Sequence, residues 1–172
     1  VHNCTEILEP TDPRHSFVCD VSSLNLVKWD EWKDSDLVKV GIYMLDAVMT
    51  DFITKASNFH GFENAIRYAT KARSLGLGVL GFHSLLQSKM IPWEGLQSKL
   101  LNKQIFKHIR TQADEASIEL GKMFGIPEWC EGSPYRNAHR LAIAPTVSNA
   151  LISGNVSEGI TPEIANVKVQ NS

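Results

Sequence analysis

Cys4 and Glu6 place a thiol and a carboxylate two positions apart near the start of the chain. In an extended segment, side chains two positions apart point to the same face, so the two reactive groups would share one small site. The same spacing also arises by chance, and cysteine commonly serves as a small core residue, so the pair alone leaves both interpretations open.

A second candidate segment follows the apolar run 140–144, which predicts a strand. Ser148 and Asn149 favour a turn or the start of a helix directly after it. Backbone amides at a helix N-terminus, together with Thr and Ser hydroxyls, form an anion site that suits a phosphate group. Simple capping of a helix is the alternative interpretation. The candidate residues are Ala144, Pro145, Thr146, Val147 and Ser148.

The stretch 76–81 matches the dinucleotide-binding pattern GxGxxG letter for letter. That fingerprint requires a buried strand before it and a carboxylate about 20 residues further on. The preceding stretch 68–74 is instead predicted to be helical and is basic. The glycines are therefore interpreted as packing residues, which let the start of a helix that runs to about Met90 lie close to neighbouring backbone.

The composition is that of a globular domain with its own core, since 43% of the 172 residues are apolar and 21% are charged. A net charge of -2 provides no basic footprint for nucleic acid. The apolar stretches are far shorter than the roughly 20 residues that a membrane span needs. Cys4, Cys19 and Cys130 form no CxxC pair and no zinc-spaced cluster, so we expect a reducing cytoplasm and no metal site.

Hydrophobic periodicity predicts a helix-rich chain with a few short strands. Apolar residues recur at three- and four-residue steps from Ser35, a predicted N-cap, to Ala56, which is typical of an amphipathic helix. Helices between short strands imply an α/β arrangement. The other predicted elements are helices at 62–72 and 94–124 and short strands at 17–19 and 24–27.

Four blocks of this sequence resemble, in order, the large subunit of class I ribonucleotide reductases. They are 4–7, 18–26, 74–81, and 136–138 together with 142–148. The resemblance covers essentially the whole chain and implies that 4–172 form part of the family's ten-stranded α/β barrel. It also implies the reduction of ribonucleoside diphosphates to deoxyribonucleotides, by a fragment that is inactive alone.

The resemblance implies roles for the residues that match. Cys4 matches the cysteine that becomes a thiyl radical and removes the ribose 3′-hydrogen, and Glu6 matches the carboxylate that takes the proton of the 3′-hydroxyl. Cys19 matches one of two reducing cysteines, and its partner would lie upstream. The segment 144–148 matches the loop that holds the substrate's diphosphate. In place of the family's Gly-Ile-Glu-Pro, the chain has Thr161 before Pro162, which removes that Glu.

The resemblance also implies the partners. A metal-containing small subunit would supply the radical, and a dithiol of the thioredoxin or glutaredoxin type would supply electrons, so this chain itself would bind no cofactor. The other expected partners are the remaining part of the large subunit and a ribonucleoside diphosphate substrate. We expect no nucleic acid and no membrane among the partners. The expected location is the cytoplasm, or a host cell's cytoplasm if the gene is carried by a phage.

His2 and Asn3 depart from the family, which has Asn-Leu before the radical cysteine. His-Asn directly before Cys resembles the C-terminal end of an intein, with Asn3 cyclising and Cys4 acting as splicing nucleophile. Residues 1–3 are thus interpreted as an intein remnant, with sequence drift as the alternative. Two alternatives for the whole chain are a fragment of an adenosylcobalamin-dependent reductase and a non-catalytic helical interaction module.

Overall fold

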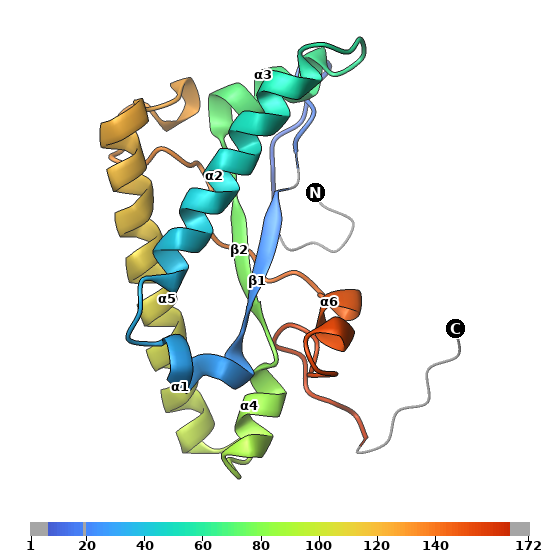
Figure 1. Cartoon of the computed structure of the whole chain (residues 1–172), viewed down its shortest axis with the longest axis vertical. Helices are drawn as coiled ribbons and strands as arrows, with labels where there is room; N and C mark the ends of the chain where they lie inside the picture. Colours follow the sequence, from blue (N-terminus) through green and yellow to red (C-terminus); the bar gives the residue numbers. More distant parts are fainter. Residues whose placement is uncertain (1–6, 19, 166–172) are drawn as a thin grey trace.

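Parallel strands β1 (Val21–Asn25) and β2 (Gly76–Leu80) lie side by side at the centre of the fold (Figure 1). The computed structural model describes residues 7–18 and 20–165. The helices in this part of the chain are α1 (Trp29–Trp32), α2 (Leu37–Ala56), α3 (Glu63–Ala72), α4 (Phe82–Ser88), α5 (Leu96–Phe124) and α6 (Val147–Ile152). Two 3-10 turns, η1 (Leu26–Lys28) and η2 (Glu128–Cys130), complete the described elements.

A third extended segment, 139–142, runs along β2 on the side away from β1. Leu77 and Leu141 form a parallel bridge. The Leu75 N–H donates to the His139 carbonyl at 2.9 Å, and the Ala142 N–H donates to the Leu77 carbonyl at 3.2 Å. The predicted strand at 140–144 is thus only a short bridged segment. The predicted α/β arrangement is confirmed, with β2 in the middle and buried along its whole length.

The prediction that a helix starts in the glycine stretch is wrong, because 76–80 form strand β2 and the helix runs only from Phe82 to Ser88. The predicted packing role of the glycines is confirmed in this different setting. A Cβ on Gly78 would lie 2.1 Å from the Ala142 carbonyl oxygen, and one on Gly76 would lie 2.7 Å from Val21 Cγ1. Close contact between neighbouring extended segments therefore requires glycine here.

Helices α2 and α5 pack against each other and cover one face of the strands (Figure 1). Their buried sides carry apolar residues at helical spacing, including Ile42, Leu45 and Met49 of α2 and Ile105 and Ile109 of α5. The predicted helices 35–56, 62–72 and 94–124 are confirmed to within two residues at each end. None of the described helices is both long enough and apolar enough to cross a membrane.

The early strands differ from the prediction. β1 ends at Asn25, and the side chain of this residue accepts the Val27 N–H at 3.0 Å, so a 3-10 turn replaces the predicted strand at 26–27. The described residues 17 and 18 belong to no strand, and Cys19 lies outside the described residues. The local capping bond by Asn25 competes with extension of the strand.

Replacing Gly78 with Ala should destabilise the protein strongly, because the new Cβ meets a backbone carbonyl that cannot move without breaking the contact between β2 and 139–142. We expect a loss on the order of 2 to 3 kcal/mol in the free energy of unfolding, measured by urea denaturation with tryptophan fluorescence. Gly95→Ala is the matched control, since its Cβ would come no closer than 3.3 Å to another atom. Equal stability of the two variants would contradict this packing.

Candidate active site

The predicted catalytic residues Cys4, Glu6 and Cys19 lie outside the described residues, as do His2 and Asn3. Their roles therefore stay predictions. The described part of the chain contains the segments on either side of them: Ile7 to Val18, and Asp20 leading into β1. It also contains the predicted diphosphate loop in full.

The loop 144–148 leads from the extended segment 139–142 into α6, so the predicted start of a helix is confirmed. Thr146 precedes the helix in a left-handed conformation, with φ of 60°. Its hydroxyl oxygen accepts the Gly159 N–H at 2.9 Å, and its carbonyl accepts the Ala150 N–H at 2.7 Å. Thr146 thus fixes the turn, while Val147 and Ser148 are exposed beside it.

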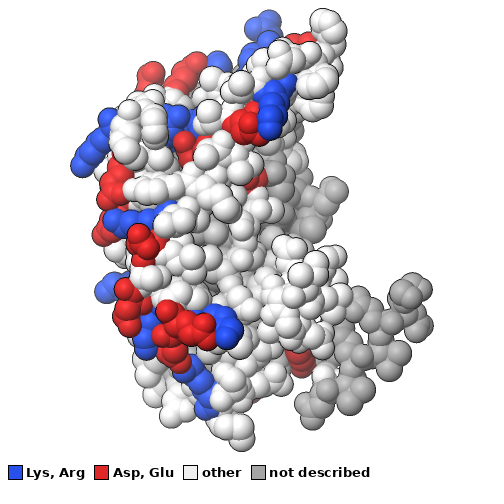
Figure 2. Space-filling model, in the orientation of Figure 1, with Lys and Arg blue, Asp and Glu red and all other residues white. Residues whose placement is uncertain are grey.

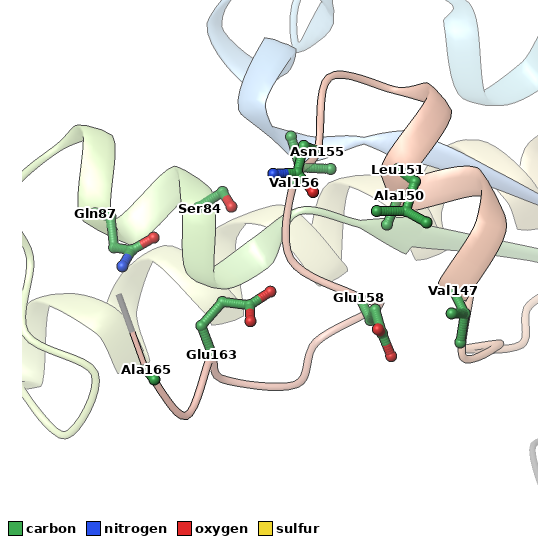
Figure 3. A pocket seen from close by; sticks show the side chains of 10 residues that line it. All are labelled: Ser84, Gln87, Val147, Ala150, Leu151, Asn155, Val156, Glu158, Glu163 and Ala165. Atoms are coloured by element: carbon green, nitrogen blue, oxygen red, sulfur yellow. The ribbon is translucent and has the colours of Figure 1, made fainter. Parts of the chain in front are cut away.

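A polar pocket of about 270 Å³ lies between α6, α4 and the chain beyond α6 (Figure 3). Glu158 and Glu163 bring two carboxylates to it, and the described residues bring no Lys or Arg. Two carboxylates without a described cation make this pocket unsuited to a diphosphate. The lining residues are Ser84, Gln87, Val147, Ala150, Leu151, Asn155, Val156, Glu158, Glu163 and Ala165.

Asp20 is a partly buried acid to which the sequence analysis assigned no role. Its carbonyl accepts the Gly76 N–H at 2.9 Å, which aligns the chain with β2. Its Oδ2 is buried with no hydrogen-bond partner in the described part of the chain, beside a cavity of about 130 Å³ lined by Val18, Val48, Met49 and Phe52. Burial raises the pKa of Asp20 to about 6, and the Asp46 carboxylate adds to the rise while Arg73 opposes it.

Asp46 is the second buried acid, and it has several partners. Its carboxylate accepts hydrogen bonds from Arg73 Nε at 2.8 Å, Arg136 Nε at 3.2 Å and Asn137 Nδ2 at 2.9 Å. Although burial alone would raise it, these bonds and the two guanidinium charges hold the pKa of Asp46 below its usual value. Asn137 is held in turn by Ser117, whose Oγ donates to Asn137 Oδ1 at 2.8 Å. The network joins α2 and α5 to the segment that leads to the loop 144–148.

Within residues 7–18 and 20–165, no three His, Cys, Asp or Glu side chains are placed to hold a metal ion. The described cysteine, Cys130, is buried, and burial raises the pKa of its thiol. Its Sγ lies 3.8 Å from the Ala72 carbonyl and 3.6 Å from the Arg136 carbonyl. Cys130 is therefore a core residue and an unreactive one.

Comparison with known proteins shows the family of this chain directly. Residues 3–136 match the family described as "Ribonucleotide reductase, barrel domain". The chain belongs to this family. The matching range includes the positions of Cys4, Glu6 and Cys19.

Two relatives that match 98% of this chain are both ribonucleoside-diphosphate reductase large subunits. The chain is 43% identical over 170 residues to the ribonucleoside-diphosphate reductase large subunit of Invertebrate iridescent virus 6, covering 98% of this chain and 18% of that protein. It is 38% identical over 171 residues to the large subunit of Invertebrate iridescent virus 3, covering 98% of this chain and 27% of that protein.

A solved structure is also similar. The class Id ribonucleotide reductase alpha subunit of Actinobacillus ureae superposes with a TM-score of 0.91 at 44% identity, covering 95% of this chain and 31% of that one. The chain therefore spans less than a third of these relatives.

Replacing Asp20 with Asn should change how stability depends on pH. Since the pKa of Asp20 rises from 3.8 to about 6 on folding, the folded state binds more protons between these values, and stability falls as pH rises from about 4 to 6. Asp20→Asn removes this loss of stability. The variant should therefore be more stable at pH 7 by on the order of 1 to 2 kcal/mol, a figure already reduced because the Asp20 side chain is partly exposed to solvent.

Urea midpoints measured from pH 4 to 7.5 test this expectation. Asp51→Asn is the control, because Asp51 lies exposed on α2 and pairs only locally with Lys55 at 2.8 Å. Asp46 does not interfere, since its lowered pKa places its own loss of stability below this pH window. The same pH slope in wild type and Asp20→Asn would refute the proposed burial of the charge.

Proposed function

We propose that this chain is the part of a ribonucleoside-diphosphate reductase large subunit that holds the radical cysteine, the general base, one reducing cysteine and the diphosphate loop. The observation that carries the proposal is the agreement of fold and sequence with the reductase alpha subunit over 95% of the chain. That structure is named as class Id, which favours a class I reductase over the adenosylcobalamin-dependent alternative.

In the proposed reaction, the Cys4 thiyl radical removes the hydrogen atom from C3′ of the ribose, forming a thiol and a carbon radical. Glu6 takes the proton of the 3′-hydroxyl, and a thiol of the reducing pair protonates the 2′-hydroxyl, which leaves as water. Cys19 and its partner upstream then supply a second proton and two electrons to the sugar and close a disulfide, while Glu6 returns its proton to the 3′-oxygen. Return of the C3′ hydrogen from Cys4 restores the thiyl radical.

The diphosphate would bind at the amide end of α6. Ser148 is exposed there and offers a hydroxyl donor. The Thr146 oxygen already accepts the Gly159 amide, so this side chain fixes the loop while its own O–H stays available to donate. Exposed amides and hydroxyl donors together suit an anionic group.

The remaining part of the large subunit would pack beside β1 and α6. Figure 2 shows charged residues gathered over the side of α1, α2 and α5, whereas the side of β1 and α6 carries few. Exposed apolar side chains there include Val21, Val147, Leu151 and Ile152, the last 85% exposed. A surface of this kind favours a protein contact. The proposal includes a small subunit that supplies the radical, a dithiol reductant and a cytoplasmic location. The chain alone is expected to be inactive.

The test is replacement of Cys4 by Ser in the full-length large subunit, assayed with its small subunit and a dithiol. A hydroxyl cannot replace the thiol as hydrogen-atom acceptor, so deoxyribonucleotide formation should fall at least about 1,000-fold, equivalent to roughly 4 kcal/mol. Cys130→Ser is the matched control and should keep its activity, because Cys130 is a core residue. Full activity of the Cys4→Ser variant would refute the proposal and favour a non-catalytic interaction module.

We propose further that His2 and Asn3 are the end of an intein and that Cys4 is the first residue after it. The support is the His-Asn-Cys order, where the family has Asn-Leu before its cysteine. The Asn3 side-chain nitrogen would attack its own carbonyl carbon, forming a succinimide, breaking the Asn3-Cys4 bond and freeing the Cys4 amine. His2 would assist by proton transfer.

Expression together with the natural upstream polypeptide tests this proposal. Mass spectrometry should find a spliced product in which an upstream segment is joined directly to Cys4, and Asn3→Ala should abolish it because no side-chain amide remains to cyclise. An intact Asn3-Cys4 bond in the active holoenzyme would contradict the proposal.

A further inference from the structure

We propose that Glu9 is a positioning residue for the active-site loop, whose buried carboxylate fixes the chain that follows Cys4 and Glu6 against the start of β2. Glu9 comes three positions after Glu6 and five after Cys4. The inference rests on the proposed roles of those two residues and adds a residue to which the sequence analysis gave no role.

The carboxylate of Glu9 is enclosed by polar partners from two other segments. Its side chain is only 1% exposed. Glu9 Oε2 accepts a hydrogen bond from Ser74 Oγ at 3.3 Å, and Oε1 lies 3.4 Å from His139 Nδ1. Ser74 is itself buried, and its Oγ lies 3.4 Å from the Tyr68 hydroxyl and 3.4 Å from His139 Nδ1. Burying a charged carboxylate is unfavourable unless such groups compensate it, so Glu9 is held in a built site.

Ile7 and Glu9 are the two buried side chains that hold the segment 7–9 against the rest of the fold. Ile7 is 7% exposed, and its Cδ1 lies 3.4 Å from where a Cβ on Gly76 would be. Leu8, between the two, is 68% exposed. This alternation is that of an extended segment with one face against the wall of the fold. An apolar and a polar anchor, two positions apart, thus fix both the position and the register of the segment.

The residues that contact Glu9 are held by further hydrogen bonds and lead to the loop 144–148. Ser74 directly precedes Leu75, whose N–H donates to the His139 carbonyl at 2.9 Å. The preceding Arg73 is held by Asp46 at 2.8 Å. His139 begins the extended segment that runs into the loop 144–148. One carboxylate therefore connects the chain that follows Cys4 and Glu6 to the start of the extended segment that runs into the loop 144–148.

A positioning role and a merely structural role predict different results. If Glu9 only stabilised the fold, its loss would lower the melting temperature and loosen the core, including Cys130. If Glu9 positions the reactive loop, its loss should lower kcat with little change in KM, because the diphosphate contacts lie elsewhere.

The experiment uses the full-length large subunit with its small subunit and compares three variants. Glu9→Ala removes both contacts and should lower kcat about 100-fold, the size expected for misplacement by roughly 1 Å, with KM for the ribonucleoside diphosphate within about twofold of wild type. Glu9→Gln keeps the shape and an acceptor oxygen for Ser74, so it should lose about tenfold or less. Glu31→Gln, an exposed residue paired with Lys28 at 2.8 Å, is the control and should not change either constant.

Alkylation by iodoacetamide, followed site by site with mass spectrometry, separates the two roles. In Glu9→Ala the rate of Cys4 modification should change several-fold while buried Cys130 stays unmodified. If Glu9→Ala does not fold, Glu9→Gln and Ser74→Ala decide by the same measurements.

Two outcomes overturn the inference. One is unchanged kcat in the folded Glu9 variants while Cys4→Ser is inactive, which leaves the proposed function intact. The other is alkylation of Cys130 in every Glu9 variant in proportion to its loss of activity. That result would show that Glu9 only stabilises the fold. An active Cys4→Ser variant would instead refute the proposed function itself.

Discussion

The carboxylate of Asp46, buried at 4% exposure in α2, is the interaction on which the arrangement of the site depends. It binds Arg73 at the end of α3 and Arg136 and Asn137 just before the extended segment 139–142. Removing one partner of a buried charge leaves the rest uncompensated, so these segments are stable only together. This network holds β2 and 139–142 side by side. At position 78 their separation leaves room only for glycine.

The candidate site is built at the ends of the segments fixed in this way. Asp20 and β1 start on one side of β2, Glu9 lies against the beginning of β2, and the loop 144–148 follows the segment on its other side. β1, β2 and 139–142 run parallel, so Asp20 and Glu9 lie near the starting end of β2, whereas the loop 144–148 follows the other end of 139–142. The barrel wall therefore positions the loops that would carry the chemistry.

The long helices were predictable from sequence because α2 and α5 keep an apolar stripe at helical period. β2 was not, because five buried residues, two of them glycine, show no periodicity and match a helix start equally well. Glu9 could not be recognised as a buried acid, since its partners Ser74 and His139 lie 65 and 130 positions away in the sequence. The resemblance predicted the family correctly, while Cys4, Glu6 and Cys19 lie outside the described residues.

The central claim is that this segment brings a radical cysteine and a diphosphate loop to one ribose. A crystal structure of the full-length large subunit with a bound ribonucleoside diphosphate measures this directly. The account predicts the diphosphate against the amides and hydroxyls of 146–148, with ribose C3′ about 3 to 4 Å from the Cys4 sulfur. Diphosphate bound away from α6, or a ribose beyond reach of Cys4, would contradict it.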